Sequence, residues 1–253
     1  MQNGLYVAAS GLLMQEARVS AISNNLANIN TAGYKRDLPV FSEYRPIDRR
    51  MPQNLIQKSL YNKTINSSVK LDEISVNQTA GPLKETGNKF DLALENPKQF
   101  FAVETPWGIR YTRDGEFTLN AEGQLVTHDG FYLLDRATGA PIVVPANAGQ
   151  PNITPDGAIY VNNAPIGEID IAAFTETEKL QKVGRNLFSA VGILPEIPEN
   201  IKLSQGFVEM SNVNPILEMV RMVDALRGFE MYQKMVQTYD SLNDKAANDI
   251  ARM

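Results

Sequence analysis

The C-terminal part of this chain carries an apolar stripe that is too long for a small domain to cover. Asn214 suits a helix N-cap and Pro215 the first helical position. From there apolar residues recur about every 3.5 residues, the spacing of a coiled-coil seam, at Met219, Val223, Leu226, Phe229, Val236, Tyr239, Leu242, Ala246 and Ile250. A helix over residues 215–251 would be about 55 Å long at the usual rise per residue. Such a helix needs a second helix, a neighbouring chain or both to cover its stripe.

A second helical pattern lies at the other end, over residues 3–29. Apolar residues follow helical spacing there, at Leu5, Ala8, Leu12, Ala17, Val19, Ile22, Leu26 and Ile29. Gly4 and Gly11 each weaken this helix by up to about 1 kcal/mol relative to Ala, so we expect it to be stable only when packed. The two ends predict a coiled-coil pair, within one chain or between chains, whose seam contains Leu12, Val19, Ile22, Met219, Val223, Leu226, Phe229, Val236 and Leu242.

The middle of the chain has the pattern of a β domain. Short apolar runs recur between turn signals, at residues 90–94, 100–104, 109–112, 117–119, 124–126, 132–134, 142–144, 159–161 and 169–174. Pairs that end in glycine suit tight hairpin turns because glycine tolerates a positive φ, and they occur at 114–115, 122–123, 129–130, 138–139 and 156–157. No helix-length amphipathic segment alternates with these runs, which argues against a parallel βαβ sheet. We therefore expect mainly antiparallel strands.

The sequence thus predicts an α+β protein with three parts. Residues 1–35 and 212–253 form a terminal helical domain, and residues 81–211 form a β-rich domain. Residues 36–80 form a linker or extended arm, because prolines at 39, 46 and 52 interrupt any helix there.

Composition excludes several classes of function. The 253 residues carry a formal net charge of −5, which argues against a nucleic-acid partner. The one dense basic patch, residues 45–50, contains a Pro and an Asp and is interpreted as a solvated loop. There is no cysteine, so disulfides and thiolate metal sites are excluded. The first residues lack the basic region of a secretory signal, and no apolar run approaches the roughly 20 residues of a membrane span.

Few residues suggest catalysis. His128, the only histidine, is expected in a turn, and one histidine cannot build a three-histidine zinc site. Glu168 and Asp170 would face one side of a strand, as paired carboxylates can in glycosidases, although 29 acidic residues make chance pairs common. Trp107 is expected at a hairpin tip, with core or edge packing favoured over sugar stacking. No catalytic residue, cofactor site or metal site is predicted. Four methionines of the last helix suit either an adaptable interface or an ordinary helix core, and they are Met219, Met222, Met231 and Met235.

The segment over residues 24–35, with the letters NNLANINTAGYK, is unusual for the end of a helix. Asn is a poor helix former, and three asparagines precede the stop and turn residues Asn30, Thr31 and Gly33. The segment resembles the signature A-N-N-[LIV]-A-N-x-x-T-x-G-[FY]-K of bacterial flagellar rod and hook proteins, with Ser23 in place of the first Ala. Three further segments resemble other blocks of that family, and they are Gly81–Leu94, Tyr111–Gly130 and Gln205–Gln237.

The resemblance implies an axial structural subunit and not an enzyme. Such proteins are exported through the hollow flagellum by its type III apparatus, without a cleaved signal peptide. Their paired terminal helices are expected to line the inner tube, with the β domain outside, and to become ordered on assembly. The chain would then belong to the periplasmic rod of the basal body. Its expected partners are copies of itself, other rod proteins and the export apparatus, with no nucleic acid, no small-molecule substrate and no membrane span.

The resemblance also assigns residues and a subtype. Residues 245–250 are similar to the C-terminal tail of the proximal-rod type, and residues 95–101 depart from the G-x-G-[FY]-F of distal rods, so the proximal type is favoured. The predicted assembly motif contains Asn24, Asn25, Leu26, Ala27, Asn28, Thr31, Gly33, Tyr34 and Lys35, and its three helical asparagines are expected to hydrogen-bond across subunits. A distal-rod or hook-type axial protein is the alternative within the family. The alternatives from other classes are a secreted carboxylate-dependent glycan hydrolase and a soluble adaptor or export factor.

Overall fold

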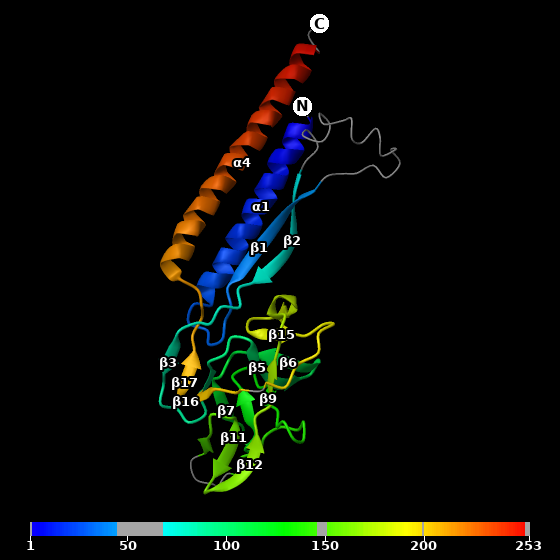
Figure 1. Cartoon of the computed structure of the whole chain (residues 1–253). Helices are drawn as coiled ribbons and strands as arrows, with labels where there is room; N and C mark the ends of the chain where they lie inside the picture. Colours follow the sequence, from blue (N-terminus) through cyan, green and yellow to red (C-terminus); the bar gives the residue numbers. More distant parts are fainter. Residues whose placement is uncertain (1, 45–67, 146–150, 199, 251–253) are drawn as a thin grey trace. The chain divides into compact units, whose positions relative to one another are not determined.

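The chain divides into two compact units in a computed structural model that describes residues 2–44, 68–145, 151–198 and 200–250 (Figure 1). The helical unit comprises Met1–Leu26, Asp37–Ser75 and Pro215–Met253, and the β unit comprises Ala27–Arg36 and Val76–Asn214. The structure is therefore α+β with a helix at each end, as the sequence predicts. Residues 45–67, including the basic patch at 45–50, lie outside the described residues.

The helical unit contains two long helices, α1 (Gln2–Ala27) and α4 (Pro215–Ile250). The sequence predicts both with boundaries within a few residues. Figure 1 shows α1 in blue beside α4 in orange and red. The unit also holds strands from the predicted arm, since β1 (Asp37–Tyr44) and β2 (Ser68–Val76) form a two-stranded sheet. Among the described residues, neither helix combines the length and apolar content needed to cross a membrane.

The two helices run antiparallel with a constant register. A Cβ atom added at Gly4 would lie 2.6 Å from the Tyr239 hydroxyl, and one added at Gly11 would lie 2.3 Å from the Tyr232 ring. A step of seven residues along α1 thus matches a step of seven residues back along α4. Gly228 meets the Gln15 side chain in the same register, because a Cβ atom there would lie 2.7 Å from its Nε2. Gly4 and Gly11, which the sequence marks as weak helix formers, therefore make room for tyrosine rings, and Gly228 makes room for the Gln15 side chain.

The β unit is built from short strands, and every strand pairing described in it is antiparallel. Its largest sheet has eight strands in the order β14-β15-β6-β5-β9-β8-β7, with β13 also paired to β5. A three-stranded sheet has the order β10-β11-β12, and two pairs join β16 to β4 and β17 to β3. The bounds are β3 (Leu83–Glu85), β4 (Leu92–Leu94), β5 (Gln99–Thr105), β6 (Gly108–Thr112), β7 (Phe117–Leu119), β8 (Leu125–Thr127), β9 (Tyr132–Leu133), β10 (Asn152–Ile153), β11 (Ala158–Val161), β12 (Ala164–Glu168), β13 (Ile171–Ala173), β14 (Gln181–Val183), β15 (Leu187–Ser189), β16 (Leu203–Gln205) and β17 (Phe207–Glu209), with the 3₁₀ helix η1 at Thr177–Lys179.

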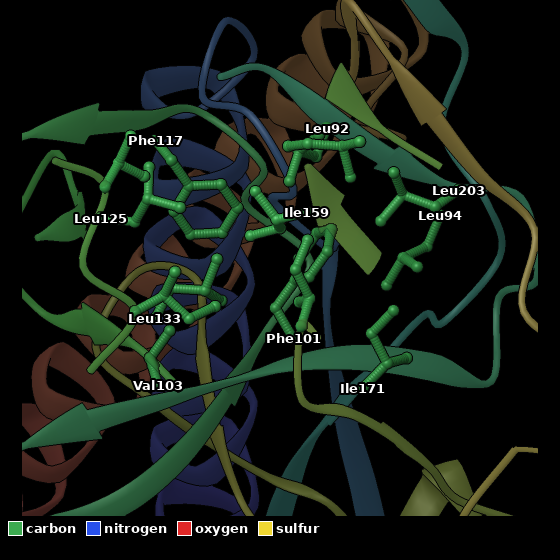
Figure 2. Packing of buried hydrophobic residues seen from close by; sticks show 14 of the residues in the cluster. Leu92, Leu94, Phe101, Val103, Phe117, Leu125, Leu133, Ile159, Ile171 and Leu203 are labelled. Atoms are coloured by element: carbon green, nitrogen blue, oxygen red, sulfur yellow. The ribbon is translucent and has the colours of Figure 1, made fainter. Parts of the chain in front are cut away.

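Two apolar clusters hold the β unit together. The larger one joins β4, β5 and β7 to the three-stranded sheet, and Figure 2 shows its side chains interleaved around Phe101. The rings of Phe101 and Phe117 meet edge to face, with centroids 5.3 Å apart. The smaller cluster lies on the other side of β5, where Phe100 packs against Phe174 and Phe188. Neighbouring residues of β5 thus point into different cores, which explains why this strand is almost wholly buried.

The sequence predicts most of the central strands but not all features of the unit. Residues 142–144 form no strand and contribute an isolated bridge between Gln124 and Val143. Seven strands of two to five residues are not predicted by the sequence, and they are β3, β10, β12, β14, β15, β16 and β17. The hairpin predicted at residues 114–115 is wrong, because β6 and β7 are not paired. Gly115 is instead required by close packing, since a Cβ atom there would lie 1.7 Å from the Leu92 carbonyl oxygen.

Replacing Gly11 with alanine tests the helix packing. Alanine raises intrinsic helix stability by about 1 kcal/mol, but its Cβ atom would overlap the Tyr232 ring, and overpacking costs about 1–3 kcal/mol. We expect Gly11→Ala to lower the free energy of unfolding by about 1 kcal/mol, measured by urea titration with far-ultraviolet circular dichroism. The control is Gly11→Ala in a Tyr232→Ala background, where the same change should stabilise. A single variant as stable as the wild type would contradict the packing.

Candidate functional site

The end of α1 is fixed to the start of β1 by asparagine side chains. The Asn25 amide donates to the Asp37 carbonyl at 3.0 Å, and the Asp37 N–H donates back to Asn25 Oδ1 at 2.8 Å. Asn25 is buried, and its Nδ2 also lies 3.5 Å from Glu218 Oε2 on α4. Asn24 donates to the Asp37 carboxylate at 2.9 Å. The Asn25 side chain thus bonds both backbone groups of Asp37, as the backbone of a neighbouring strand would. This contact within the chain explains why a poor helix former occupies position 25.

From Ala27 onward, the predicted assembly motif belongs to the β unit. Thr31 donates to the Asn28 side chain at 3.2 Å, closing the turn after the helix. Gly33 has a φ of 67° and donates its N–H to the Glu209 carbonyl at 2.7 Å. A Cβ atom at this glycine would lie 2.3 Å from the Asp114 backbone nitrogen. Both the left-handed backbone and the close approach therefore require glycine here.

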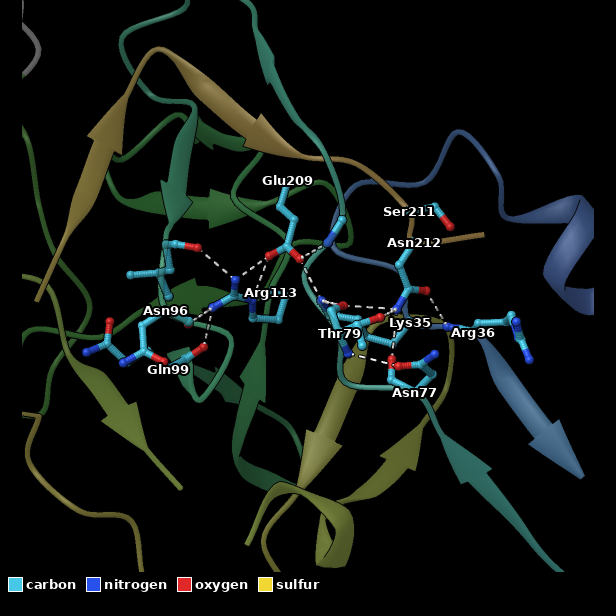
Figure 3. Close-up of polar contacts among 12 residues, drawn as sticks. Lys35, Arg36, Asn77, Thr79, Asn96, Gln99, Arg113, Glu209, Ser211 and Asn212 are labelled. Carbon is cyan, nitrogen blue, oxygen red and sulfur yellow. Dashed lines mark hydrogen bonds and ion pairs between the residues drawn. The ribbon is translucent and has the colours of Figure 1, made fainter. Parts of the chain in front are cut away.

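Lys35 ends the motif and is buried in an ion pair. Its ammonium lies 2.6 Å from Glu209 Oε1 and donates to the Thr79 carbonyl at 2.8 Å (Figure 3). The second oxygen of Glu209 accepts from Arg113 Nε at 2.7 Å and also pairs with Arg113 Nη2. The Gly81 N–H donates to Glu209 Oε1 at 2.8 Å. One carboxylate therefore joins segments that are 174 and 96 residues away from it in the sequence.

Arg113 has a partner for every N–H of its guanidinium. Besides the two bonds to Glu209, Nη1 donates to the carbonyls of Asn96 at 2.7 Å and Gln99 at 2.6 Å, and Nη2 donates to the Leu94 carbonyl at 2.7 Å. A planar fork with five donors suits this arrangement, which an ammonium could not reproduce. The arginine thus ties the ends of β4 and β5 to β17.

The Lys35–Glu209–Arg113 cluster contains two cations and one anion. Burial lowers the pKa of the Lys35 ammonium, and the nearby Glu209 carboxylate opposes that shift. Burial likewise lowers the pKa of Arg113, again opposed by Glu209. Backbone carbonyls solvate the excess positive charge where water cannot reach. Because all three side chains are buried, removing the anion would leave both cations without a counter-charge.

A second set of bonds runs beside the charged cluster. The Arg36 N–H donates to Asn212 Oδ1 at 2.9 Å, and the Asn212 amide donates to the Asn77 carbonyl at 2.8 Å. The side chain of Lys182 covers Tyr34, with its ammonium 3.8 Å from the ring centroid, and donates to the Lys35 carbonyl at 3.0 Å. Residues 33–36 are thus held along residues 209–212 by both backbone and side-chain bonds.

Asp114, next to Arg113, has an unusual protonation equilibrium. Burial raises the pKa of its carboxyl group to about 6, although hydrogen bonds from the Glu116 N–H and the Asn186 amide oppose the shift. The Asn186 amide donates to Asp114 at 2.7 Å. This carboxyl group lies beside the backbone that Gly33 approaches, so its charge affects the same part of the β unit.

The residues of the predicted coiled-coil seam differ in their exposure. Ile22 is buried, and four others are half-buried, namely Leu12, Val19, Phe229 and Val236. The remaining members on α4 are exposed at 45–58%, and they are Met219, Val223, Leu226 and Leu242. The buried residues of α4 lie one position earlier, at Glu218, Ala225 and Gly228. The seam therefore stays a prediction for contacts between chains.

The residues weighed for catalysis do not form a site. His128 is exposed in the β8–β9 turn, as predicted. Glu168 ends β12 and pairs with Arg136, whereas Asp170 lies in the connection to β13, so the two do not alternate on one strand. Trp107 lies at the tip of the β5–β6 hairpin, as predicted. The prediction that it packs in the core is wrong, because it is 70% exposed. No cluster of three potential metal-binding side chains occurs in the described ranges.

Three protein-family models match the chain, and together they contain the charged cluster. The model "Flagella basal body rod protein" matches residues 5–35, which include Lys35. The model "Flagellar hook protein FlgE/F/G D1 domain" matches residues 96–161, which include Arg113. The model "Flagellar basal body rod FlgEFG protein C-terminal" matches residues 204–249, which include Glu209. Each model thus contributes one residue to the Lys35–Glu209–Arg113 cluster.

Whole-length relatives agree with these matches. A flagellar basal-body rod protein FlgF of Mesorhizobium japonicum is 34% identical over 97% of both chains. This chain belongs to the flagellar basal-body rod protein family. A FlgF of Caulobacter vibrioides is 31% identical over the full length of both chains, and a FlgG of Buchnera aphidicola is 33% identical over 95% of this rod protein and 97% of its own length.

Sequence reasoning found one member of the charged cluster in this rod protein and missed the other two. Lys35 is the last residue of the predicted assembly motif, whereas Arg113 and Glu209 were not singled out. A signal was available, because both lie inside segments that resemble family blocks, at 111–130 and 205–237. Opposite charges in separate blocks of an otherwise apolar pattern could have indicated a pair. Their distance in sequence hides which charges meet.

Removing the shared anion tests the cluster. We expect Glu209→Gln to lower the free energy of unfolding of the rod protein by about 3–5 kcal/mol, because it leaves two buried cations without a counter-charge. Urea titration followed by near-ultraviolet circular dichroism measures the change. Asp129→Asn, which removes the exposed pair with Arg185, should cost less than about 1 kcal/mol. Equal effects of the two variants would contradict the role of burial.

The raised pKa of Asp114 predicts a pH dependence. The folded pKa of about 6 exceeds the unfolded value of 3.8, so the folded state binds the proton more tightly. Its stabilising contribution is complete below about pH 4 and is lost as the pH rises through about 6. The free energy of unfolding of the wild type should therefore fall by roughly 3 kcal/mol relative to Asp114→Asn as the pH rises from about 3 to about 7. Urea titrations of both proteins across this range measure the difference, which a pH-independent offset would contradict.

Proposed function

We propose that this chain is a non-enzymatic structural subunit of the flagellar rod, which assembles with copies of itself and other rod proteins into the shaft that joins motor to hook. The observation that carries this proposal is the exposed apolar surface of α4 in a chain of the rod family. Met219, Val223 and Leu226 are each close to half exposed, and Met231 is 63% exposed. Exposed apolar surface of this extent on one helix is typical of an interaction site.

The intramolecular pairing of α1 with α4 is proposed as an antiparallel coiled coil. The contacts at Gly4, Gly11 and Gln15 keep one register with Tyr239, Tyr232 and Gly228, with one step of seven residues followed by one of four. Repeats of this kind are typical of coiled-coil seams. Small residues at these positions let tyrosine rings fill the interface.

The exposed seam residues of α4 are proposed to pack between subunits, and they are Met219, Val223, Leu226 and Leu242. Met219 and Leu226 each follow a buried residue, Glu218 and Ala225, so the exposed residues form a neighbouring stripe on the same helix. A stripe used by another chain leaves the intramolecular pair intact. Of the three asparagines expected to bond across subunits, Asn24 is the exposed one, whereas Asn25 and Asn28 are buried. Asn24 is therefore the one that can contact a neighbour directly.

The subtype, location and export route follow from the family. We assign the chain to the proximal-rod type, FlgF, because two of the relatives given above carry that name and residues 245–250 resemble its C-terminal tail. Its location is then the periplasmic rod of the basal body. Export through the flagellar type III apparatus is proposed from the family, and a chain with no cysteine avoids unwanted disulfides in an oxidising compartment.

A charge placed on the exposed stripe tests assembly. We expect Val223→Asp to leave the melting temperature of the purified chain unchanged within error, because the side chain is exposed, and to prevent rod formation. Complementation of a strain that lacks the gene, with swimming assays and electron microscopy of isolated basal bodies, measures the effect. The matched control is Thr238→Asp, which adds the same charge at an exposed polar position of α4 that lies off the stripe.

Complete rods and normal swimming with Val223→Asp would contradict the proposed interface. A large fall in the melting temperature would instead assign Val223 a role inside the chain. Loss of swimming with both variants would show that any added negative charge on α4 is harmful, which would remove the specificity of the stripe.

A further inference from the structure

The β unit has a pocket that the proposed helix contacts do not use. It has a volume of about 330 Å³ and lies at the turn between β14 and β15. Its walls include the aromatic rings of Trp107 and Phe131 and the side chains of Val183 and Leu187. Trp107 is 70% exposed at a hairpin tip. A large aromatic side chain that is both exposed and beside a recess is typical of a contact surface.

The rim of this pocket is positively charged on an acidic chain. Arg110 and Arg185 line it together with a single acidic residue, Asp129. Arg185 pairs with Asp129 at 3.1 Å, and Arg110 Nη1 donates to the Ile109 carbonyl at 2.9 Å. Arg110 Nε is buried without a hydrogen-bond partner among the described residues. The local charge is thus opposite in sign to the net charge of −5 of the whole chain.

The other end of the same β-hairpin carries an apolar protrusion with acidic neighbours. Gln181 pairs with Ser189 there, whereas Val183 and Leu187 pair beside the pocket. Leu194 in the loop after β15 is 86% exposed, and Ile197 is 73% exposed. Glu196 lies between them and is held by Thr175, whose hydroxyl donates to its carboxylate at 2.9 Å. Glu178, before β14, adds negative charge at this end, whereas Glu176 pairs with Lys179.

We propose that the pocket of one copy of this chain binds Leu194 of a second copy, with Glu196 facing Arg110 and Arg185. The basic rim and the acidic loop are complementary in charge, and the apolar walls suit the exposed leucine. The inference rests on the proposed function, because it adds a contact between β units to the helix contacts of a rod. Recess and protrusion lie at opposite ends of one hairpin, so the contact is head to tail and can repeat without closing on itself.

Cysteine cross-linking tests this contact cleanly, because the chain has no cysteine of its own. The full-length variants Val183→Cys and Leu194→Cys are mixed at high concentration and oxidised. We expect the mixed disulfide dimer to exceed, by at least fivefold, the dimer formed when Thr118→Cys replaces Val183→Cys. Thr118 is exposed on β7, at the far edge of the large sheet, and serves as the matched control.

Charge exchange adds a second readout. Arg185→Glu in the Val183→Cys chain should reduce the mixed dimer to the control level, and Glu196→Arg in the Leu194→Cys chain should restore it. Failure of this rescue, or a mixed dimer no larger than the control, would overturn the proposal. If Trp107→Ala impaired swimming while the mixed dimer stayed at the control level, the pocket would bind another partner, and the proposal would also be overturned.

A failure of the cross-linking experiment can be distinguished from a failure of the proposed rod function. Basal bodies from cells that carry Val223→Asp report on the helix contacts, whereas the cross-link reports on the β unit alone. Rods that depend on Val223 but give no cross-link would leave the rod function standing and remove this inference.

Discussion

The β unit depends on the ion pairs that the buried Glu209 carboxylate makes with Lys35 and Arg113. Lys35 and Arg113 reach this carboxylate from segments far away in the sequence, and all three side chains are excluded from water. A buried charge without its partner costs several kcal/mol, so these segments are stable together or not at all. The fully bonded guanidinium of Arg113 extends this dependence to the ends of β4 and β5. One ion cluster thus makes the folding of distant strands cooperative.

The same cluster explains why the residues between α1 and β1 are so particular. Gly33 must be glycine because its backbone is left-handed and lies against Asp114. Its N–H then meets the carbonyl of Glu209, whose side chain binds Lys35 two residues later. Within the β unit, the stretch that follows α1 therefore lies along the stretch that precedes α4. In the helical unit, Asn25 performs a similar task by bonding both backbone groups of Asp37.

The surfaces proposed for assembly differ from those that stabilise each unit of this rod protein. The side chains that hold each unit together are buried, whereas the residues proposed for contacts between subunits are exposed apolar groups on α4 and on the β14–β15 hairpin. On α4 the two sets are separated by a single position, as Ala225 and Leu226 illustrate. A subunit that must fold alone and then pack against neighbours needs such a division, because side chains committed to its own core are not available to another chain.

The sequence by itself determined the two helices, the antiparallel β middle and the resemblance to rod proteins. These depend on local periodicity, turn residues and motifs, which are properties of neighbours along the chain. The strands β16 and β17 were missed, whereas β7, which is also three residues long, was predicted from an apolar run between turn signals. Only the tertiary structure decided that Lys35, Arg113 and Glu209 meet, and that Ala225 rather than Leu226 is buried. Pairing of distant charges and the rotation of a helix about its axis depend on packing, which a linear pattern does not specify.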